Sequence, residues 1–389
     1  MAKVKDIAMQ IRGVSYHPED LHDNLDEDSV VLLRANNIKD GKLILDDVVY
    51  VSKSKVAEQQ YLQTGDILIC ASSGSKELVG KAAYIDSVDT PMTFGAFCKV
   101  VRPQSEYSEY LGHYFESPFY RNRISELSAG ANINNIKNEN IDNLEVRLVT
   151  EEKQNSIVEI LNQLNCLIFL RKQQLAKLDE LIKARFVEMF GDEQAFNKEP
   201  LSQNVEEMFI GPFGSSLKNE SFVSKENGYC MVYEQKHAIR KTMDVETRYI
   251  DKPKYEELKR FSIHGGDIIV SCRGTIGETY IVPLNAPLGI MHPSIMKIRV
   301  KDSIYNRVFF DFLLQEKLKQ HEAQANGSGV KMAVTASALG KEEFIVPSIP
   351  FQNQFAAFVE RVDQQKQTVQ QSLEKLELMK KALMQEYFG

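Results

Sequence analysis

One stretch of the chain occurs twice, at residues 153–191 and again at residues 351–389. Gln352 and Phe388 each lie 198 residues after their counterparts Gln154 and Phe190 (352 − 154 = 388 − 190 = 198), without a gap. An internal repeat constrains the architecture more strongly than any single motif does. The chain is therefore predicted to consist of two half-chain copies, each a globular domain followed by a long helix.

Both copies carry apolar residues at alternating steps of four and three, which is the heptad spacing of a coiled-coil seam. A pattern sustained for so long favours a mutual pair of helices, each about 60 Å long, over two unrelated surface helices. Four charged residues interrupt it: Arg171, Arg185, Lys366 and Lys380. The apolar seam comprises Ile157, Leu161, Leu164, Ile168, Leu175, Leu178 and Ile182 in the first copy and Phe355, Val359, Val362, Val369, Leu373, Leu376 and Leu383 in the second.

Mixed α/β (α+β) domains are predicted on either side of the first helix. The predicted order is domain 1–150, helix 151–191, domain 192–348 and helix 349–389. Because the ends of a compact domain usually lie close together, the helices should pair antiparallel, with one domain at each end and a pseudo-twofold axis through the pair. Helices are expected at residues 4–11, 107–127, 201–210 and 304–324, and strands at 30–34, 43–51, 67–71, 81–85, 97–101, 229–233, 247–250, 267–272, 279–282 and 295–300.

Two landmarks relate the domains to each other. Gly65-Asp66 matches Gly266-Asp267, and residues 97–100 match residues 295–298. Polar loops at 129–140 and 325–335 close the two domains.

Composition excludes several classes of protein. The net charge of −7 provides no overall basic field, so any phosphate contact must come from local loops or from a partner. Five scattered cysteines without a Cys-x-x-Cys pair indicate a reducing cytoplasm and speak against a zinc site, as does the spacing of the histidines. No signal peptide and no membrane-spanning apolar run are predicted.

Catalytic motifs are missing as well. The sequence has no Asn/Asp-Pro-Pro-aromatic stretch for adenine methylation, no Gly-x-Gly motif after a strand and no complete phosphate-binding loop. We therefore expect no catalytic residue, no metal and no cofactor bound by this chain.

Polar and basic side chains on the loops after strands are the candidates for reading DNA bases, since Arg and Lys suit guanine and Asn and Gln suit adenine. Ordinary turn chemistry is the alternative for each of them. In the first domain they are Arg12, Ser15, Tyr16, Arg34, Asn36, Asn37, Ser72, Ser73, Ser75, Lys76, Asn132, Asn134, Asn135 and Lys137. In the second they are Phe213, Ser215, Ser216, Lys218, Lys236, His237, Arg273, Thr275, His292, Ser294 and Lys331.

For two of these candidates, Phe213 and Arg273, a structural role is weighed against contact with DNA. Residues 211–214 could form a tight turn with Phe213 as a core plug, or their glycines could let backbone amides approach a phosphate. Arg273, between Cys272 and Gly274, could reach outward to a base or pair with a nearby carboxylate.

Several motifs, in their order within the double repeat, resemble the specificity subunit of type I restriction-modification enzymes. They are RGVSY at residues 12–16, LLRANNI at 32–38, GPFGSSLK at 211–218, SCRGTIG at 271–277 and the Phe-Gly ends of both long helices. The resemblance implies two target-recognition domains and two conserved spacer helices in a non-catalytic scaffold. It further implies double-stranded DNA as ligand and two methyltransferase (modification) subunits and restriction/translocase subunits as partners. S-adenosylmethionine, ATP and magnesium would be held by those partners.

The resulting hypothesis is a chain that selects a gapped, asymmetric DNA sequence, one half per domain. Two rivals remain open at this point. One is a two-headed coiled-coil adaptor that joins proteins without binding DNA, and the other is a stand-alone nuclease whose site escapes motif analysis.

Overall fold

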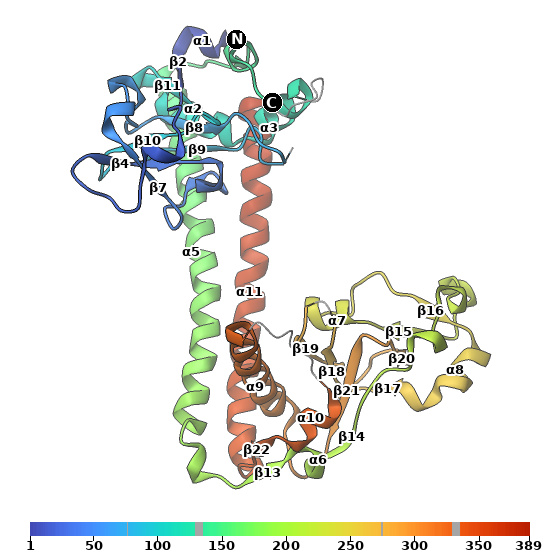
Figure 1. Ribbon diagram of the computed structural model, residues 1–389. Helices are drawn as coiled ribbons and strands as arrows, with labels where there is room; N and C mark the ends of the chain where they lie inside the picture. The colour runs from blue at the N-terminus through green and yellow to red at the C-terminus, as the bar shows by residue number, and fades with distance from the viewer. Residues whose placement is uncertain (76, 129–134, 274, 329–334) are drawn as a thin grey trace. The chain divides into compact units, whose positions relative to one another are not determined.

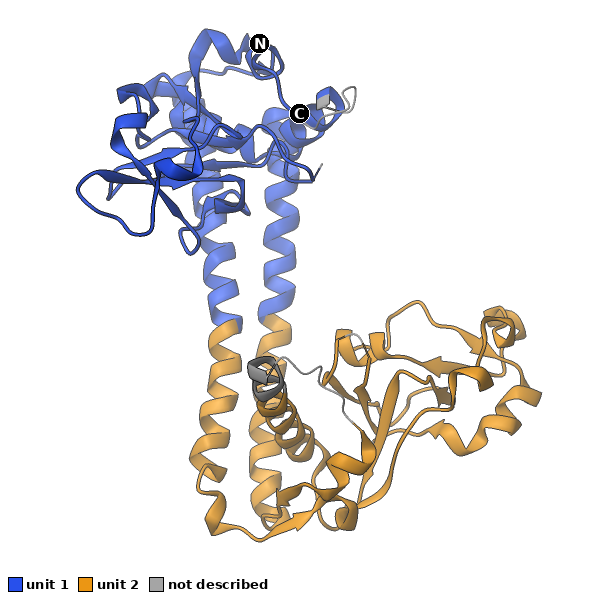
Figure 2. Ribbon diagram, in the orientation of Figure 1, with its two compact units in different colours: residues 1–175, 369–389 blue, residues 176–368 orange. Residues whose placement is uncertain are grey.

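The computed structural model describes residues 1–75, 77–128, 135–273, 275–328 and 335–389. The chain divides into two compact units, residues 1–175 with 369–389 and residues 176–368 (Figure 2). The two long helices, α5 (Glu151–Phe190) and α11 (Ile349–Phe388), each contribute a stretch to both units.

The first unit contains two four-stranded sheets (Figure 1). One is antiparallel, in the order β2 (Ala8–Arg12), β11 (Cys98–Pro103), β8 (Ile67–Cys70) and β9 (Ala82–Tyr84). The other has the order β10 (Met92–Phe94), β4 (Ser29–Leu33), β7 (Val49–Ser52) and β3 (Leu21–His22), with β10 and β4 parallel. Small pairs join β1 (Ala2–Lys3) to β12 (Glu145–Val146) and β5 (Ile38–Lys39) to β6 (Lys42–Leu43).

The second unit repeats this framework. Its antiparallel sheet has the order β14 (Val205–Ile210), β21 (Ile295–Val300), β18 (Ile268–Ser271) and β19 (Thr279–Ile281). Its mixed sheet has the order β16 (Tyr249–Ile250), β15 (Cys230–Tyr233), β20 (Gly289–Met291) and β17 (Ser262–Ile263), with β15 and β20 parallel. The strand β13 (Lys198–Pro200) pairs with β22 (Glu343–Ile345).

Corresponding ion pairs show how closely the two sheets agree. Arg102 donates from Nε and Nη2 to the two carboxylate oxygens of Asp66 at 2.7 and 2.8 Å. Arg299 makes the same two bonds to Asp267 at 2.7 and 2.9 Å. Both carboxylates are 1% exposed, so each needs the two-pronged partner that a guanidinium supplies. The internal repeat therefore extends to individual side-chain pairs.

Within the first unit the two long helices pack antiparallel. The seam residues Leu161 and Leu164 share a core cluster with Met384 and Phe388 from the opposite end of α11. Phe388 lies 5.1 Å, between ring centroids, from Tyr110 on α2 (Ser108–Glu116). The repeated Phe-Gly end is thus the anchor between helix and domain.

Within the second unit the same arrangement recurs. Phe190, the counterpart of Phe388, lies 4.8 Å from Phe309 of α9 (Arg307–Ser328) and 5.1 Å from Phe351 at the start of α11. The end of α5 therefore packs against the beginning of α11, which is again antiparallel.

Every apolar residue of the predicted seam is buried or half-buried. The charged seam positions have polar partners. Arg171 Nε donates to Ser372 Oγ (3.3 Å), Lys366 pairs with Asp179 (2.6 Å) and Lys380 pairs with Glu116. Arg185 pairs with Glu188 (2.7 Å). Because each charge is satisfied beside the seam, the four interruptions do not break the pairing.

Two predicted helices were partly wrong, for the same reason in both units. Only α1 (Val4–Ile7) and α6 (Leu201–Asn204) are helical, and residues 8–12 and 205–210 continue as β2 and β14. These strands form because β11 and β21 offer long hydrogen-bonding edges, which local sequence does not reveal.

Other differences concern shorter features. The helix expected at residues 107–127 is interrupted at Ser117, before Pro118, into α2 and α3 (Pro118–Ser128). The helix α4 (Asn138–Asp142) begins inside the first expected loop, residues 129–140. The helix α9 continues to Ser328, into the second expected loop, and α10 (Ala336–Lys341) follows directly after that loop. Two short helices, α7 (Gln235–Arg240) and α8 (Lys252–Leu258), and the parallel strands β10 and β20 were not predicted.

The second landmark is displaced by one residue. Cys98 pairs with Cys70 on β8, whereas Ile295 pairs with Ser271 on β18. The counterpart of Cys98 is therefore Ile295, and Lys99 corresponds to Met296, not to Lys297. A one-residue slip turns a side chain to the other face of the sheet, which is why Lys99 is half-buried and Lys297 is 1% exposed.

Among the helices in the described ranges, none is both long enough and apolar enough to cross a membrane.

Candidate nucleic-acid interface

Loops of the first unit meet at the connection between β10 and β11, residues 95–97; we call this meeting point the first loop cluster. Main-chain hydrogen bonds hold these loops together. The bonds are Gly95 N–H to Leu33 O (2.9 Å), Ala71 N–H to Phe97 O (2.9 Å), Val14 N–H to Phe94 O (2.8 Å) and Ile136 N–H to Ala71 O (2.8 Å).

The second unit builds an equivalent cluster on the connection between β20 and β21, residues 292–294; we call it the second loop cluster. The bonds are His292 N–H to Tyr233 O (2.9 Å), Cys272 N–H to Ser294 O (2.9 Å) and Gly211 N–H to Ile295 O (3.0 Å). Loops far apart in the sequence are thus brought to one edge of each framework, as a surface that reads base edges requires.

The side chains at corresponding positions differ sharply. In the first cluster the connection is Gly95-Ala96-Phe97, and the Phe97 side chain is 71% exposed. In the second it is His292-Pro293-Ser294, with His292 half-buried. The same main-chain connection therefore carries an exposed apolar ring in one unit and a half-buried imidazole in the other.

Basic residues flank the first cluster. Arg12 is exposed and lies opposite Lys99 in the β2–β11 pairing. Lys99 donates from Nζ to Ile136 O (2.8 Å) and Asn138 Oδ1 (2.5 Å), and burial lowers its pKa below the ordinary value, with the charge of Arg12 also acting to lower it. No ion pair of Arg12 is found among the described residues, so its exposed guanidinium is open to a phosphate or a guanine.

In the second cluster, among the described residues, two cations form ion pairs and a third, Arg273, does not. Glu234 pairs with Lys236 (2.9 Å) and with Arg248, which also stacks 4.0 Å above the ring of Phe222. Arg273 is exposed and forms no ion pair with a described carboxylate. The alternative of a structural ion pair is therefore not realised, and this guanidinium is open to a ligand.

Three predicted contact residues are buried and need correction. Asn37 (1% exposed) accepts the N–H of Arg34 at 2.8 Å and donates to two main-chain carbonyls. His237 (0% exposed) accepts the N–H of Glu234 at 3.0 Å in the same manner. Ser294 (6% exposed) bonds to His292. All three shape the loops, and their side chains are not available for direct contact with a base.

Phe213 also differs from one expectation. Its side chain is 86% exposed, so the interpretation as a core plug is wrong. A phenylalanine side chain left in water forgoes roughly 1.5 to 3 kcal/mol of burial free energy. Its exposure therefore marks Phe213 as a candidate contact for a ligand.

The remaining candidates divide by environment. Arg34 and Asn36 are both held by Asp47, at 3.1 and 2.7 Å. The others are exposed or half-buried on the loops: Ser15, Tyr16, Ser72, Ser73, Ser75, Asn135, Lys137, Ser215, Ser216, Lys218 and Thr275. Lys76, Asn132, Asn134 and Lys331 lie outside the described residues.

Comparison with known proteins places the chain in a protein family. The family model described as the type I restriction modification DNA specificity domain matches residues 14–180 and 210–378, once in each half of the chain. The chain belongs to this family. The double repeat predicted from the sequence is thereby confirmed.

Individual relatives agree with this assignment. The chain is 40% identical over 183 residues to the type I restriction enzyme StySPI specificity subunit of Salmonella potsdam, covering 47% of this chain and 39% of that one. Over 184 residues it is 39% identical to the EcoKI specificity subunit of Escherichia coli (strain K12), with the same coverage. The matches thus span well under half the length of these curated relatives.

A solved structure supports the fold. A chain from work on complex assembly and conformational transition of the type I R-M system superposes with a TM-score of 0.60 at 15% identity, covering 100% of this chain and 96% of that one. At this level of identity the likeness concerns the fold alone.

Within this specificity-domain chain, sequence reasoning missed Phe97, Lys99 and Arg248. Phe97 was predicted as the first residue of a strand, residues 97–101. In the structure β11 begins one residue later, at Cys98, and Phe97 lies in the exposed loop before it.

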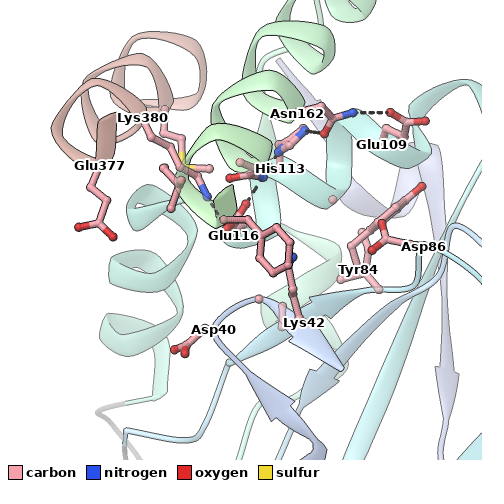
Figure 3. A pocket seen from close by; sticks show the side chains of 18 of the residues that line it. Asp40, Lys42, Tyr84, Asp86, Glu109, His113, Glu116, Asn162, Glu377 and Lys380 are labelled. Carbon is pink, nitrogen blue, oxygen red and sulfur yellow. Dashed lines mark hydrogen bonds and ion pairs between the residues drawn. The ribbon is translucent and has the colours of Figure 1, made fainter. Parts of the chain in front are cut away.

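The first unit also contains a groove of about 790 Å³ between α2, the β5–β6 hairpin and the two long helices (Figure 3). A polar chain crosses it: Lys380 pairs with Glu116, His113 Nε2 lies 2.9 Å from Asn162 Oδ1, and Asn162 Nδ2 donates to Glu109 (3.1 Å). Burial acts to raise the pKa of Glu116, but His113 and Lys380 outweigh it and lower the pKa to about 2. The charges that line this part of the groove therefore pair with one another and tie α2 to both helices.

Proposed function

We propose that this chain is the DNA-reading, non-catalytic subunit of a type I restriction-modification complex, and that each unit reads one half of a bipartite, asymmetric sequence in double-stranded DNA. One observation carries the proposal. The two units share a main-chain framework down to the Arg102–Asp66 and Arg299–Asp267 pairs, yet they present unlike side chains at the same loop positions. A shared frame with divergent loops is what reading two different half-sites requires.

The chemistry of the loops favours DNA over a protein ligand. Each loop cluster exposes an arginine without an ion pair among the described residues, Arg12 in the first and Arg273 in the second. Guanidinium groups match both phosphate oxygens and the O6/N7 edge of guanine. The negative net charge makes this local supply of cations necessary, and membership of a DNA specificity family argues against the adaptor hypothesis.

The proposed surface for a protein partner is an apolar stripe on α5. Ile160, Leu167 and Leu170 are 37%, 43% and 49% exposed, and they recur at spacings of seven and three beside the buried seam. An apolar stripe at helical spacing fits a helix of another subunit. We assign this stripe to the methyltransferase subunits, of which the internal repeat suggests two, with restriction/translocase subunits joining through them.

The chemistry of the complex is assigned to those partners. Among the described residues no group of three His, Cys, Asp or Glu side chains is arranged to hold a metal ion. In this proposal S-adenosylmethionine, ATP and magnesium are bound by partner subunits and the complex works in the cytoplasm, a reducing compartment that suits five free cysteines.

A binding experiment tests the proposal. The purified chain, alone and with a co-expressed methyltransferase subunit of its own host, is titrated with labelled duplex at increasing salt. Salt-sensitive binding that prefers one gapped sequence supports the proposal. Absence of DNA binding under both conditions would favour the adaptor, and metal-dependent cleavage by the chain alone would favour the nuclease.

A further inference from the structure

Each loop cluster exposes one phenylalanine ring. Phe213 is 86% exposed in the second unit, and Phe97 is 71% exposed in the first. The two are not counterparts in the repeat, because Phe97 O accepts the N–H of Ala71 where Ser294 O accepts that of Cys272. Each unit therefore places an aromatic ring at its candidate interface from a different loop.

The loop that carries Phe213 is fixed on both sides of the ring. Gly211 donates its N–H to Ile295 O (3.0 Å), and a Cβ at this glycine would lie 2.3 Å from His292 O, so the close approach requires glycine. Pro212 is buried, and Ser216 donates its N–H to Phe213 O (2.8 Å) to close a 3-10 turn. The ring is therefore presented by a pre-organised segment.

The surroundings of this ring select its ligand. The same loop cluster holds the exposed Arg273 and the half-buried His292. A loop cluster that exposes an apolar ring together with a cation and a hydrogen-bonding side chain matches a ligand that combines anionic phosphates with flat apolar faces, which describes the bases and backbone of DNA.

We propose that Phe213 is a wedge that stacks against an unstacked base step in or beside the half-site read by the second unit, and that Phe97 does the same in the first. This inference rests on the proposed DNA-binding function. Aromatic and aliphatic side chains that enter a base step unstack it and kink the duplex. Pyrimidine–purine steps unstack most easily, so the wedge adds sequence preference at a position that no hydrogen bond reads.

Fluorescence of 2-aminopurine, which rises when the base leaves the stack, tests the wedge directly. The probe is placed at successive positions of a duplex that the complex binds, one position per duplex. Wild-type complex should raise the signal at one step next to each half-site. Phe213→Ala should abolish the rise at one half only and weaken binding about tenfold, and Phe213→Trp should retain the rise.

Matched controls come from the same units. Leu284 is 78% exposed and follows the end of β19, whereas the loop of Arg273 precedes its start. Leu25 is 52% exposed and precedes β4, whereas the first loop cluster follows the end of that strand. Leu284→Ala and Leu25→Ala therefore remove comparable apolar side chains away from the loop clusters. Both variants should behave as wild type, and Phe97→Ala should abolish the rise at the other half.

The outcomes separate the wedge from the function it rests on. Wild-type complex that binds DNA but raises no signal, or Phe213→Ala that keeps the signal, overturns the wedge and leaves the DNA-binding proposal standing. A loss of affinity in Phe213→Ala that is reproduced by replacing thymine with uracil, without any 2-aminopurine response, would assign the ring to a thymine methyl group instead. If Phe213→Ala instead fails to capture the methyltransferase subunit, the ring is a protein contact. If wild type binds no DNA, both proposals fall.

Discussion

Ser294 donates its main-chain N–H to Nδ1 of His292 at 3.2 Å, and its hydroxyl lies 2.8 Å from the same nitrogen. Nδ1 is therefore an acceptor, and in the neutral ring the proton resides on Nε2. Burial lowers the pKa of His292; Glu234 opposes this shift, while the charges of Arg273 and two neighbouring cations support it. At neutral pH the ring thus offers a single N–H donor to a ligand.

Replacing His292 with alanine should reduce discrimination at one base position by about 1 to 2 kcal/mol, because one hydrogen bond in a partly dry interface is lost. Since the lowered pKa keeps the ring neutral, the wild-type preference should be constant between about pH 8 and pH 7. Competition binding with single-base variants measures both effects. A preference that rises as the pH falls through this range, and that disappears in His292→Ala, would show that the charged ring is the reader.

Arg273→Ala should relax specificity at one position of the half-site read by the second unit, at a cost of about 1 to 3 kcal/mol. Arg273→Lys should recover only part of this loss, because an ammonium group lacks the two-pronged geometry of guanidinium. Arg260→Ala is the matched control, since Arg260 is exposed but lies over the ring of Phe209. Equal loss at all sequences, specific and non-specific, would make Arg273 a phosphate contact.

Glu116→Gln should lower the free energy of unfolding of the first unit by roughly 1 to 2 kcal/mol at neutral pH, because Lys380 and His113 lose a carboxylate partner. The folded pKa of Glu116 is depressed to about 2 from an ordinary value of 4.5, so its contribution is present above pH 4.5 and is lost as the pH falls toward 2. Denaturant titrations of both proteins should therefore converge in acid. Glu126→Gln, at an exposed pair with Arg123, is the control; a pH-independent difference for Glu116→Gln would contradict the electrostatic account.

The apolar stripe on α5 yields a test of partner binding. Leu167→Asp combined with Leu170→Asp should abolish capture of a co-expressed methyltransferase subunit, because two carboxylates would be buried in the joint helix surface. Leu25→Asp changes an equally exposed leucine of the same unit and should leave capture intact. Normal capture by the double variant would move the partner to another surface.

Insertion of one heptad into both long helices tests whether the helix pair sets the gap between half-sites. Seven residues placed after Leu175 and seven after Thr368 keep the seam in register and add about 10 Å, or about three base pairs. Sequence selection should return the same half-sites with a wider gap. An insertion into only one helix should instead disrupt the pairing, and an unchanged gap in a correctly assembled double insertion would refute the idea.

Features with strong local signals were predicted well from the sequence. The long helices follow from an uninterrupted heptad, and β4, β8 and β21 follow from short runs of large apolar residues. Residues 8–12 and 205–210 were not predicted as strands, because their partners β11 and β21 lie some 90 residues away in the sequence. Non-local pairing of this kind overrides local preference.

In the candidate interface, too, some features could be predicted from the sequence and others could not. That polar loops follow strands and meet at one edge could be inferred, because strand ends converge in a sheet. That Asn37 and His237 act as buried caps could not be inferred, since the chemistry that lets them bond to the main chain would equally let them bond to a base. Phe97 was missed because a one-residue difference in strand start decides whether its ring is buried or exposed.

Selection of bound duplexes from a random pool, by the chain assembled with its methyltransferase subunit, tests the central claim most directly. The account predicts one bipartite motif with a fixed gap; Arg273→Ala should relax one half only and Arg12→Ala should relax the other half only. A single contiguous motif, or relaxation of the same half by both variants, would contradict the assignment of one half-site to each unit.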